Sequence, residues 1–473
     1  MNRKQRRAET KSGGTGAAAS SAVQRLFAAG LRQHRAGRID EAERSFLQVL
    51  AIRPHHTDSL HLLGVIAYQT GRHDLAVDLI SKAIAINPGE ASAHSNLGNL
   101  FLHQGRLDEA VASYRRAIGL RPNFPTALNN LGNALRARQA PDEAVACYRQ
   151  AIDLGSDDPE THYNLAMALL ARGDMEAGWE EHEWRWRTQQ FIAARRDFTQ
   201  PQWRGEAAQG RTLLIHAEQG YGDTLHFCRY ATLAAARGLR VIVETPKPLE
   251  RLLRGLSGVD QVVTPAEAPP EFDLHCPMLS MPLALGTTIE TIPGQMPYLY
   301  ADPAQVEAWR IRLAGPGERG PRIGLAWAGD PRKHLLSAAA VARRRSVGLG
   351  ALAPLFEVSG LNFVSLQKDD PAPPGRFPLT DFMEEMEDFA DTAALVANLD
   401  LIISIDTSVA HLAAALGKPV WLLNCFDPCW RWLVGRRDSP WYPTVRLYRQ
   451  LRPGDWNSVV AEVADDLRSL AGV

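Results

Sequence analysis

The chain has 473 residues, of which 45% are hydrophobic, and a formal net charge of -1. That length corresponds to about three domains of ordinary size, and the balanced charge does not favour nucleic-acid binding. No run of about 18 apolar residues occurs, so no membrane span is expected. The five cysteines form no paired framework. We therefore expect a cytoplasmic protein of several domains.

Residues 1–22 contain several lysines and arginines and a Gly/Ser-rich stretch, without the apolar core of a secretory signal. Such a composition buries too little apolar surface to fold. We predict a disordered basic tail.

The next region, residues 23–190, repeats itself along the chain. Gly30, Gly64, Gly98 and Gly132 follow one another at intervals of 34 residues, and alanines and prolines mark two further phases of the same period. A period of about 34 residues is typical of tetratricopeptide repeats, each of which is a pair of antiparallel helices. We predict an all-α superhelix whose surface recruits a protein.

Three asparagines recur one repeat apart on the first helix of successive pairs: Asn96, Asn130 and Asn164. Stacked repeats would align their amides along the concave face, where they could hold the backbone of an extended acceptor. Asparagine is also a common choice at this position of the repeat, so a purely structural role is the alternative.

All 11 tryptophans lie at or beyond Trp179. Trp179, Trp184, Trp186 and Trp203 gather where the array should end. We interpret them as a hydrophobic cap that docks the array on the next domain, with an aromatic ligand platform as the alternative.

Alternating strand and helix patterns begin at Thr212. Residues 212–216 and 241–244 read as strands, and residues 224–237 read as a helix after a glycine-rich turn that contains Gly220 and Gly222. A strand, a glycine turn and a helix open a Rossmann-like domain, here predicted over residues 205–314. The turn lacks the full dinucleotide fingerprint, so nicotinamide binding does not follow.

A second Rossmann-like domain is predicted over residues 321–473, after a Pro/Gly-rich linker at 315–321. Its expected elements are strands at 322–327, 362–366, 399–405 and 420–423 and a helix at 409–416. The protein should therefore end in two α/β domains with a cleft between them.

Asp406, Thr407 and Ser408 precede the predicted helix at 409–416 and can supply its capping side chains. The first turn of a helix also presents unpaired N–H groups, which suit a phosphate. His411 and the basic segment 343–345 could add further contacts. The alternative is a capped helix without a ligand.

Two segments resemble glycosyltransferase family 9, the heptosyltransferase group. Residues 406–419 are similar to the family's donor-side signature, and residues 222–226 are similar to its amino-terminal motif. A closer resemblance is to bacterial proteins that join tetratricopeptide repeats to such a domain, with residues 439–443 and 446–450 typical of that branch. Some of those proteins are implicated in glycosylation of flagellin.

The resemblance implies a GT-B pair of Rossmann-like domains, inversion at the anomeric carbon, and no metal or cofactor, the nucleotide-sugar being a substrate. Two observations agree with it. The sequence contains no Asp-x-Asp pair, and Glu is absent between Asp388 and Ala461, where retaining GT-B enzymes usually carry a glutamate pair.

By position, the resemblance assigns the catalytic base to Asp223. An inverting transfer needs such a group to take the proton of the acceptor hydroxyl. Gly220 and Gly222, which precede Asp223, are expected to bind the acceptor. The alternative is that Asp223 caps the following helix.

Donor binding is assigned to residues of the second domain. Arg345 and Ser346 fall near the family's phosphate-binding position, but extra residues at 335–342 leave open which of Arg343, Arg344 and Arg345 reaches the phosphate. Gln367 and Lys368 end a predicted strand and either contact the nucleotide or are solvated.

We therefore expect a glycosyltransferase that moves a hexosyl, heptosyl or nonulosonyl group from a nucleotide-sugar to an acceptor, with a protein recruited by the repeats as the favoured acceptor. The alternatives are an enzyme that builds lipopolysaccharide or another glycan, and a repeat scaffold whose transferase domain is inactive. The sequence leaves open the sugar, the nucleotide, the acceptor and the oligomeric state.

Overall fold

The computed structural model describes residues 20–267, 269–314, 320–330, 342–368 and 375–472. Most of the predicted tail, residues 315–319 of the predicted linker and residues 335–341 of the extra segment lie outside the described residues. The chain divides into two compact units, Met1–Asp157 and Asp158–Val473.

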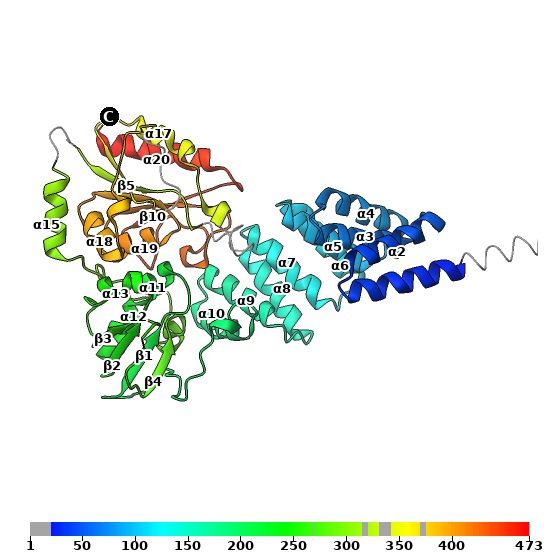
Figure 1. Cartoon of the computed structure of the whole chain (residues 1–473), viewed down its shortest axis with the longest axis horizontal. Helices are drawn as coiled ribbons and strands as arrows, with labels where there is room; N and C mark the ends of the chain where they lie inside the picture. Colours follow the sequence, from blue (N-terminus) through cyan, green and yellow to red (C-terminus); the bar gives the residue numbers. More distant parts are fainter. Residues whose placement is uncertain (1–19, 268, 315–319, 331–341, 369–374, 473) are drawn as a thin grey trace, which may run out of the picture. The chain divides into compact units, whose positions relative to one another are not determined.

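The first unit is an all-α array of antiparallel helix pairs (Figure 1). A helix over residues 20–35 is followed by α2 (Ile39–Ile52), α3 (Thr57–Gln69), α4 (His73–Ile86), α5 (Ala91–His103), α6 (Leu107–Leu120), α7 (Pro125–Ala137) and α8 (Pro141–Asp153). The predicted tetratricopeptide-repeat superhelix is confirmed.

The repeating glycine is required by the contact between the two helices of a pair. A Cβ atom on Gly132 of α7 would lie 2.5 Å from the Tyr148 ring of α8, and one on Gly98 of α5 would lie 2.7 Å from the Tyr114 ring of α6. Tyr114 and Tyr148 are fully buried. The aromatic ring of the second helix therefore fills the space that any side chain on the first would need.

We expect opposite effects from the same substitution at two helical glycines. Gly132→Ala should destabilise the protein by about 1–3 kcal/mol, because the new methyl group overlaps Tyr148. Gly119 of α6 is exposed with nothing within 4 Å of a built Cβ, so Gly119→Ala should stabilise by up to about 1 kcal/mol through helix propensity. Urea unfolding followed by far-UV circular dichroism measures both, and equal stability of the two variants would refute the packing argument.

The second unit begins with a helical pair that packs into its own core. This pair, α9 (Pro159–Arg172) and α10 (Met175–His182), is followed by the short helices η1 (Glu183–Arg187) and η2 (Ile192–Ala194). The Trp179 ring is buried and lies edge-on to Trp430 at 5.2 Å and to Trp441 at 6.4 Å between centroids. Trp179 thus joins the last helical pair to the carboxy-terminal part of the same unit.

The first sheet of this unit has four parallel strands in the order β3-β2-β1-β4. They are β1 (Thr212–His216), β2 (Arg240–Glu244), β3 (Gln261–Val263) and β4 (Leu274–Pro277). The helices around it are α11 (Tyr221–Phe227), α12 (Arg229–Ala236), α13 (Lys247–Leu253), η3 (Met278–Ser280) and α14 (Met281–Ala284), whereas the next helix, α15 (Pro303–Arg312), packs against α18 of the second α/β half. Leu213 and Ile215 face the core shared with α11–α13, whereas Leu214 packs against Phe198 and Phe272 on the other face.

The second sheet has six parallel strands in the order β10-β9-β8-β5-β6-β7. They are β5 (Arg322–Ala326), β6 (Asn362–Ser365), β7 (Leu379–Asp381), β8 (Leu401–Ile405), β9 (Val420–Asn424) and β10 (Val445–Arg449). The helices are η4 (Leu349–Leu352), α17 (Ala353–Phe356), η5 (Met383–Glu385), α18 (Phe389–Ala397), α19 (Ser408–Ala415), η6 (Trp430–Trp432) and α20 (Trp456–Ala471).

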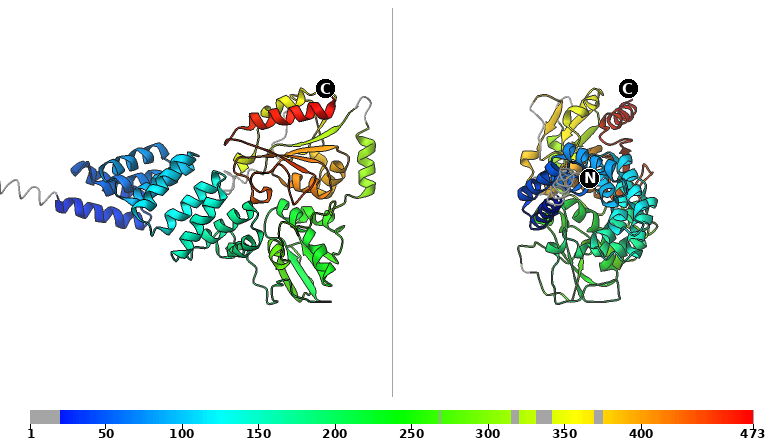
Figure 2. Two further views of the ribbon diagram at one scale, coloured as in Figure 1. Left: turned by 180° about the vertical axis from the view of Figure 1, so that it is seen from behind. Right: turned by 90° about the vertical axis from the view of Figure 1, so that its right-hand side faces the viewer.

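Helices cover both faces of this second sheet. In Figure 1, α17 and the red helix α20 lie on one side and the orange helices α18 and α19 on the other, and Figure 2 shows the same layers from behind. Ile403 and Ile405 of β8 pack towards α20, whereas Ile402 packs towards α18 and α19. The predicted α/β class with parallel sheets after the repeats is confirmed.

The main differences from the predicted elements lie at helix ends. The helix predicted at 224–237 begins three residues earlier, at Tyr221, and is interrupted at Cys228 between α11 and α12. The basic segment 343–345 lies in a short helix over residues 342–345. Within the part of the chain that the structure describes, no helix combines the length and apolarity needed to cross a membrane.

Candidate functional site

The starts of α11 and α19 meet inside the second unit, one from each α/β half. A Cβ atom on Gly222 would lie 3.0 Å from Cδ2 of His411 and 3.6 Å from the Cα atom of Ser408. Glycine at 222 therefore permits the close approach of the two helices. Because α11 follows β1 and α19 follows β8, this contact lies at the carboxyl ends of the strands, where open α/β sheets bind ligands.

Asp223 is the third residue of α11 rather than its N-cap. Its Oδ2 atom accepts a hydrogen bond of 3.1 Å from the backbone N–H of Gly220, the N-cap residue. Its Oδ1 atom accepts from Nη2 of Arg431, which lies 208 residues further along the chain. The Asp223 side chain retains 23% exposure, so one carboxylate is held by both α/β halves and still reaches solvent.

Asp406 lies at the start of α19, between a cation and a histidine. Its Oδ2 atom is 3.4 Å from Nη1 of Arg345, and its Oδ1 atom is 3.7 Å from Nε2 of His411. Burial alone would raise the pKa of Asp406, but the charge of Arg345 and the contact with His411 lower it below the ordinary value of 3.8. Asp406 is therefore ionised, and it holds Arg345 at the site.

Among the three arginines that the sequence left open, Arg345 is the one that pairs with the α19 turn. Arg343 and Arg344 are exposed, and Arg344 lies 3.9 Å from Asp427. Ser346 lies next to Arg345, but its hydroxyl donates to the Ala342 carbonyl at 2.8 Å and accepts from the Gly329 N–H at 3.3 Å.

The rings of Tyr442 and His226 lie next to His411, at the contact between the two α/β halves. Nδ1 of His411 lies 2.9 Å from the hydroxyl of Tyr442, and the ring of His226 lies 5.4 Å from that of His411. Burial lowers the pKa of His411 below 6.5, despite Asp406 nearby. Burial also lowers the pKa of His226 well below that value. Both rings are therefore neutral.

His226 is fully buried, and neither of its ring nitrogens has a hydrogen-bond partner among the described residues. Its ring instead packs against Trp441 at 4.6 Å and Tyr442 at 5.2 Å between centroids. A buried polar group without a partner costs free energy.

We expect His226→Phe to stabilise the protein at pH 7 by about 1–3 kcal/mol, because phenylalanine keeps the ring contacts and removes two unsatisfied nitrogens. The folded protein keeps His226 neutral, whereas the unfolded chain can protonate it, because burial lowers its pKa well below 6.5 only in the fold. The free energy of unfolding therefore decreases as the pH falls below 6.5, by up to about 1.4 kcal/mol per pH unit, and this loss is absent above pH 6.5. The Phe variant should lose less stability between pH 7 and pH 5. Urea unfolding at several pH values measures this, with the exposed His55 changed to Phe as control, and an unchanged pH dependence would contradict the explanation.

The prediction that side chains of residues 406–408 cap the helix is wrong. Thr407 occupies the N-cap position of α19, but its side chain makes no capping bond to the described backbone. Its hydroxyl instead lies 3.1 Å from that of Ser404, and the Asp406 carboxylate is committed to Arg345. The N–H groups of Ser408 and the following residues remain available at the site.

Gln367 and Lys368 lie at the end of β6, but both are engaged by backbone. Gln367 is buried; its Oε1 atom accepts from the N–H groups of Trp327 and Ala328 at 3.0 and 2.8 Å, which fixes the loop after β5. Lys368 is exposed, and its Nζ atom donates to the Met386 carbonyl at 3.2 Å.

The asparagines of the repeats bond to neighbouring repeats. Asn96 lies 2.7 Å from Nε2 of His61, and Asn130 donates to Oδ1 of Asn99 at 3.0 Å. Both side chains are half-buried. Asn164 belongs to the second unit, on α9. The amides of Asn96 and Asn130 thus link successive helix pairs. Their partners differ, His61 in one case and Asn99 in the other, so the asparagine period alone did not predict them.

The pairings of Arg431 with Asp223 and of Tyr442 with His411 were not predicted from the sequence. The two residues of each pair are more than 30 residues apart along the chain, so no local motif links them. The described residues contain no group of three or more His, Cys, Asp or Glu side chains arranged to hold a metal ion.

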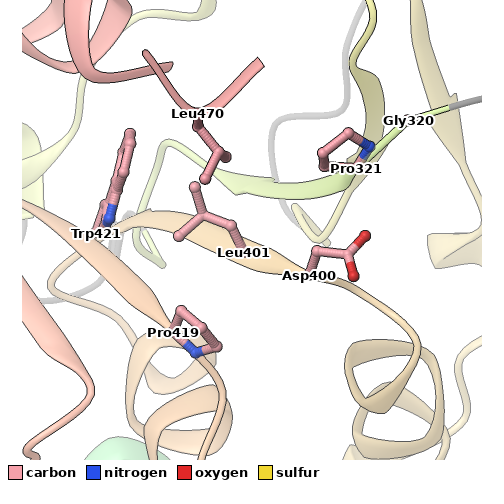
Figure 3. A pocket seen from close by; sticks show the side chains of 7 residues that line it. All are labelled: Gly320, Pro321, Asp400, Leu401, Pro419, Trp421 and Leu470. Atoms are coloured by element: carbon pink, nitrogen blue, oxygen red, sulfur yellow. The ribbon is translucent and has the colours of Figure 1, made fainter. Parts of the chain in front are cut away.

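A separate pocket lies at the amino ends of the strands of the second sheet. Figure 3 shows Leu401 and Pro419 at the starts of β8 and β9, with Trp421 and Leu470 beside them. The carboxylate of Asp400 in this pocket accepts the N–H of Arg322 at 2.7 Å. This pocket is at the amino ends of the strands and does not belong to the site formed by α11 and α19.

Family models match both parts of the chain. Tetratricopeptide-repeat models match residues 27–91, 79–112, 98–139 and 132–173, and the model of glycosyltransferase family 9 (heptosyltransferase) matches residues 385–423. The latter segment contains α18, β8 and α19, and so includes Asp406 and His411 but not Asp223. The chain thus combines tetratricopeptide repeats with a glycosyltransferase family 9 segment.

A curated relative is the protein FlbA of Caulobacter vibrioides, which is 28% identical over 328 residues. The match covers 64% of this chain and 54% of the relative, so the chain spans about half the length of the curated relative that it matches.

The similar solved structures correspond to about a third of the chain. A crystal structure of MamA has 20% identity and a TM-score of 0.31 and covers 35% of this chain and 97% of that one. The pilF protein of Pseudomonas aeruginosa has 21% identity and a TM-score of 0.34, with 35% and 76% covered. YrrB, described as a TPR protein with an unusual peptide-binding site, has 15% identity and a TM-score of 0.31, with 35% and 85% covered.

Proposed function

We propose that the protein is an inverting glycosyltransferase that uses no metal and moves a sugar from a nucleotide-activated donor to a protein recruited by the repeats. The observation that carries the proposal is the meeting of α11 and α19, which places Gly222, the neighbour of Asp223, beside His411 and Ser408, where Asp406 pairs with Arg345. The family 9 match over the α19 segment supports the same reaction class. Flagellin is one candidate acceptor, because the chain resembles repeat-containing transferases that are implicated in glycosylation of flagellin.

In this reaction the acceptor oxygen attacks the anomeric carbon while the bond to the donor phosphate breaks, and its electron pair leaves with the phosphate. Asp223 takes the proton of the acceptor hydroxyl. Arg345 and the free N–H groups at the start of α19 neutralise the negative charge of the leaving phosphate. Gln367 supports the donor side indirectly, by holding the loop after β5.

A binding experiment tests the donor part of the proposal. Arg345→Ala should weaken nucleotide binding by about 1.5–3 kcal/mol, the range for a lost hydrogen bond to a charged group. Isothermal titration with a panel of nucleoside diphosphates and nucleotide-sugars measures this, with exposed Arg343→Ala as the matched control. Chelator should leave both binding and transfer unchanged, and transfer that requires an added divalent cation would contradict the proposed mechanism.

Glycoproteomic comparison of wild-type cells and cells lacking the gene tests the acceptor. Loss of a glycan from a protein, flagellin included, supports protein glycosylation, whereas a change confined to lipopolysaccharide favours the glycan-building alternative. An intact glycome together with absent nucleotide binding would favour a non-catalytic scaffold.

A further inference from the structure

Arg431 is a buried cation that the mechanism above leaves without a role. It lies in η6, and its side chain is 8% exposed. Its guanidinium stacks on the ring of Trp430 at 4.6 Å and lies 5.2 Å from the ring of Phe227 in α11. The group therefore lies between the two α/β halves, beside Asp223.

The guanidinium has more donors than strong acceptors around it. Nη2 donates to Asp223, Nη1 donates to the Cys429 sulfur at 3.0 Å, and Nε is buried with no hydrogen-bond partner among the described residues. A thiol is a weak acceptor. Arginine often binds a carboxylate through two parallel hydrogen bonds, but here only Nη2 donates to Asp223. The Nη1 group is therefore left for a stronger acceptor, such as another anion.

A second arginine lies within electrostatic range. Arg431 acts on both Arg345 and Asp406 by charge, and Asp406 holds Arg345 at the start of α19. Two arginines and two aspartates thus form one cluster whose formal charges cancel. An incoming phosphate would find two cations there, one of them with unused donors.

The last helical pair fixes the position of Arg431. Helix α9 packs against η6, and the N–H of Val434 donates to the Ala171 carbonyl at 3.1 Å. Trp179 of α10 packs edge-on to Trp430, the residue on which Arg431 stacks. The guanidinium is therefore held on a packed support.

We infer that Arg431 is a second phosphate-binding residue, whose Nη1 group contacts the leaving diphosphate of the donor while Nη2 keeps its contact with Asp223. One guanidinium then orients the base and neutralises the leaving group. The phosphate takes the position of the thiol as acceptor for Nη1. The inference rests on the proposed function, since it names a further contact at the same donor site.

Titration of the full chain with inorganic pyrophosphate tests the inference without knowledge of the sugar or nucleotide. Arg431→Met should weaken pyrophosphate binding about tenfold or more, the loss expected for a charge-assisted hydrogen bond. Arg431→Lys should recover only part of it, because an ammonium cannot contact both anions as a planar fork does. The control is Arg437→Met, an exposed arginine paired with Glu462, which should bind as the wild type does.

Loss of binding could also arise because Arg431→Met leaves Asp223 unpaired and repulsive. Asp223→Asn removes that charge. In the Asp223→Asn background, Arg431→Met should still weaken binding about tenfold or more if the guanidinium contacts pyrophosphate. If the loss disappears in that background, Arg431 acts only by neutralising Asp223 and the inference is overturned. Circular dichroism melting of each variant verifies that the fold is retained.

Arg345→Met separates failure of the inference from failure of the proposed function. Weaker binding with Arg345→Met and unchanged binding with Arg431→Met would overturn the inference alone. A wild-type chain that does not bind pyrophosphate would overturn both the inference and the metal-free donor site on which it rests.

Discussion

Changing Asp223 to asparagine is expected to lower sugar transfer by about 10²- to 10⁴-fold, the usual contribution of a general base. Asparagine has the same size, and its carbonyl oxygen can still accept the N–H of Gly220, the bond that Asp223 makes at 3.1 Å. What is lost is the carboxylate that takes the proton of the acceptor hydroxyl. Folding and nucleotide binding should therefore persist while turnover collapses.

Steady-state transfer to the native acceptor, beside nucleotide titration of the same preparation, measures this effect. Asp438→Asn is the matched control, because Asp438 is 71% exposed and pairs with Arg436 at the surface. A turnover of the Asp223 variant within a fewfold of the wild type would remove Asp223 as the base. Lost nucleotide binding would instead indicate that the variant disturbs the contact between α11 and α19.

The longer strands were the elements of the fold that the sequence predicted best. Residues 212–216 and 399–405 are nearly continuous apolar runs, which is typical of parallel strands covered on both faces, and they form β1 and β8. The short strands β3 and β7 have three residues each. Runs of that length carry no periodicity that separates a strand from a loop.

Helix ends were predicted less well because tertiary contacts determine them. Helix α11 starts at Tyr221, whose ring packs on Phe389 of the second α/β half at 5.4 Å. At the start of α19, residues with good capping side chains are present, but Arg345 and Ser404 engage Asp406 and Thr407. Local propensity identified the turn but not the partners that compete for its side chains.

The sequence motifs predicted several residues of the site, but they did not predict the pairs between residues that are far apart in the chain. Asp223, Asp406 and His411 belong to local patterns that resemble family 9, whereas the partner of Asp223 is Arg431, on the other side of the fold. A pair separated by so many residues leaves no spacing to recognise in one sequence. The assignment of catalytic and donor-binding roles therefore stays a prediction, supported by geometry.

The boundary between the two units determines which truncation should work. Residues 158–190 of the predicted array, which contain α9 and α10, belong to the second compact unit. Met167 and Ala171 of α9 pack against the core of this unit, and Ala171 accepts the N–H of Val434. Any truncation that removes α9 exposes part of that core.

A chain of residues 158–473 is accordingly expected to fold and to bind donor nucleotide, since helical repeats contact mainly their neighbours and the second unit keeps its own core. Its transfer to the native acceptor should fall about 10²-fold or more, because the acceptor is no longer held near the site at high effective concentration. A chain of residues 173–473, which lacks α9, should unfold or aggregate. Circular dichroism melting, nucleotide titration and transfer assays on both truncations measure these differences. If residues 158–473 glycosylate the native acceptor as well as the full chain does, the repeats do not select the acceptor, and protein recruitment through them loses its support.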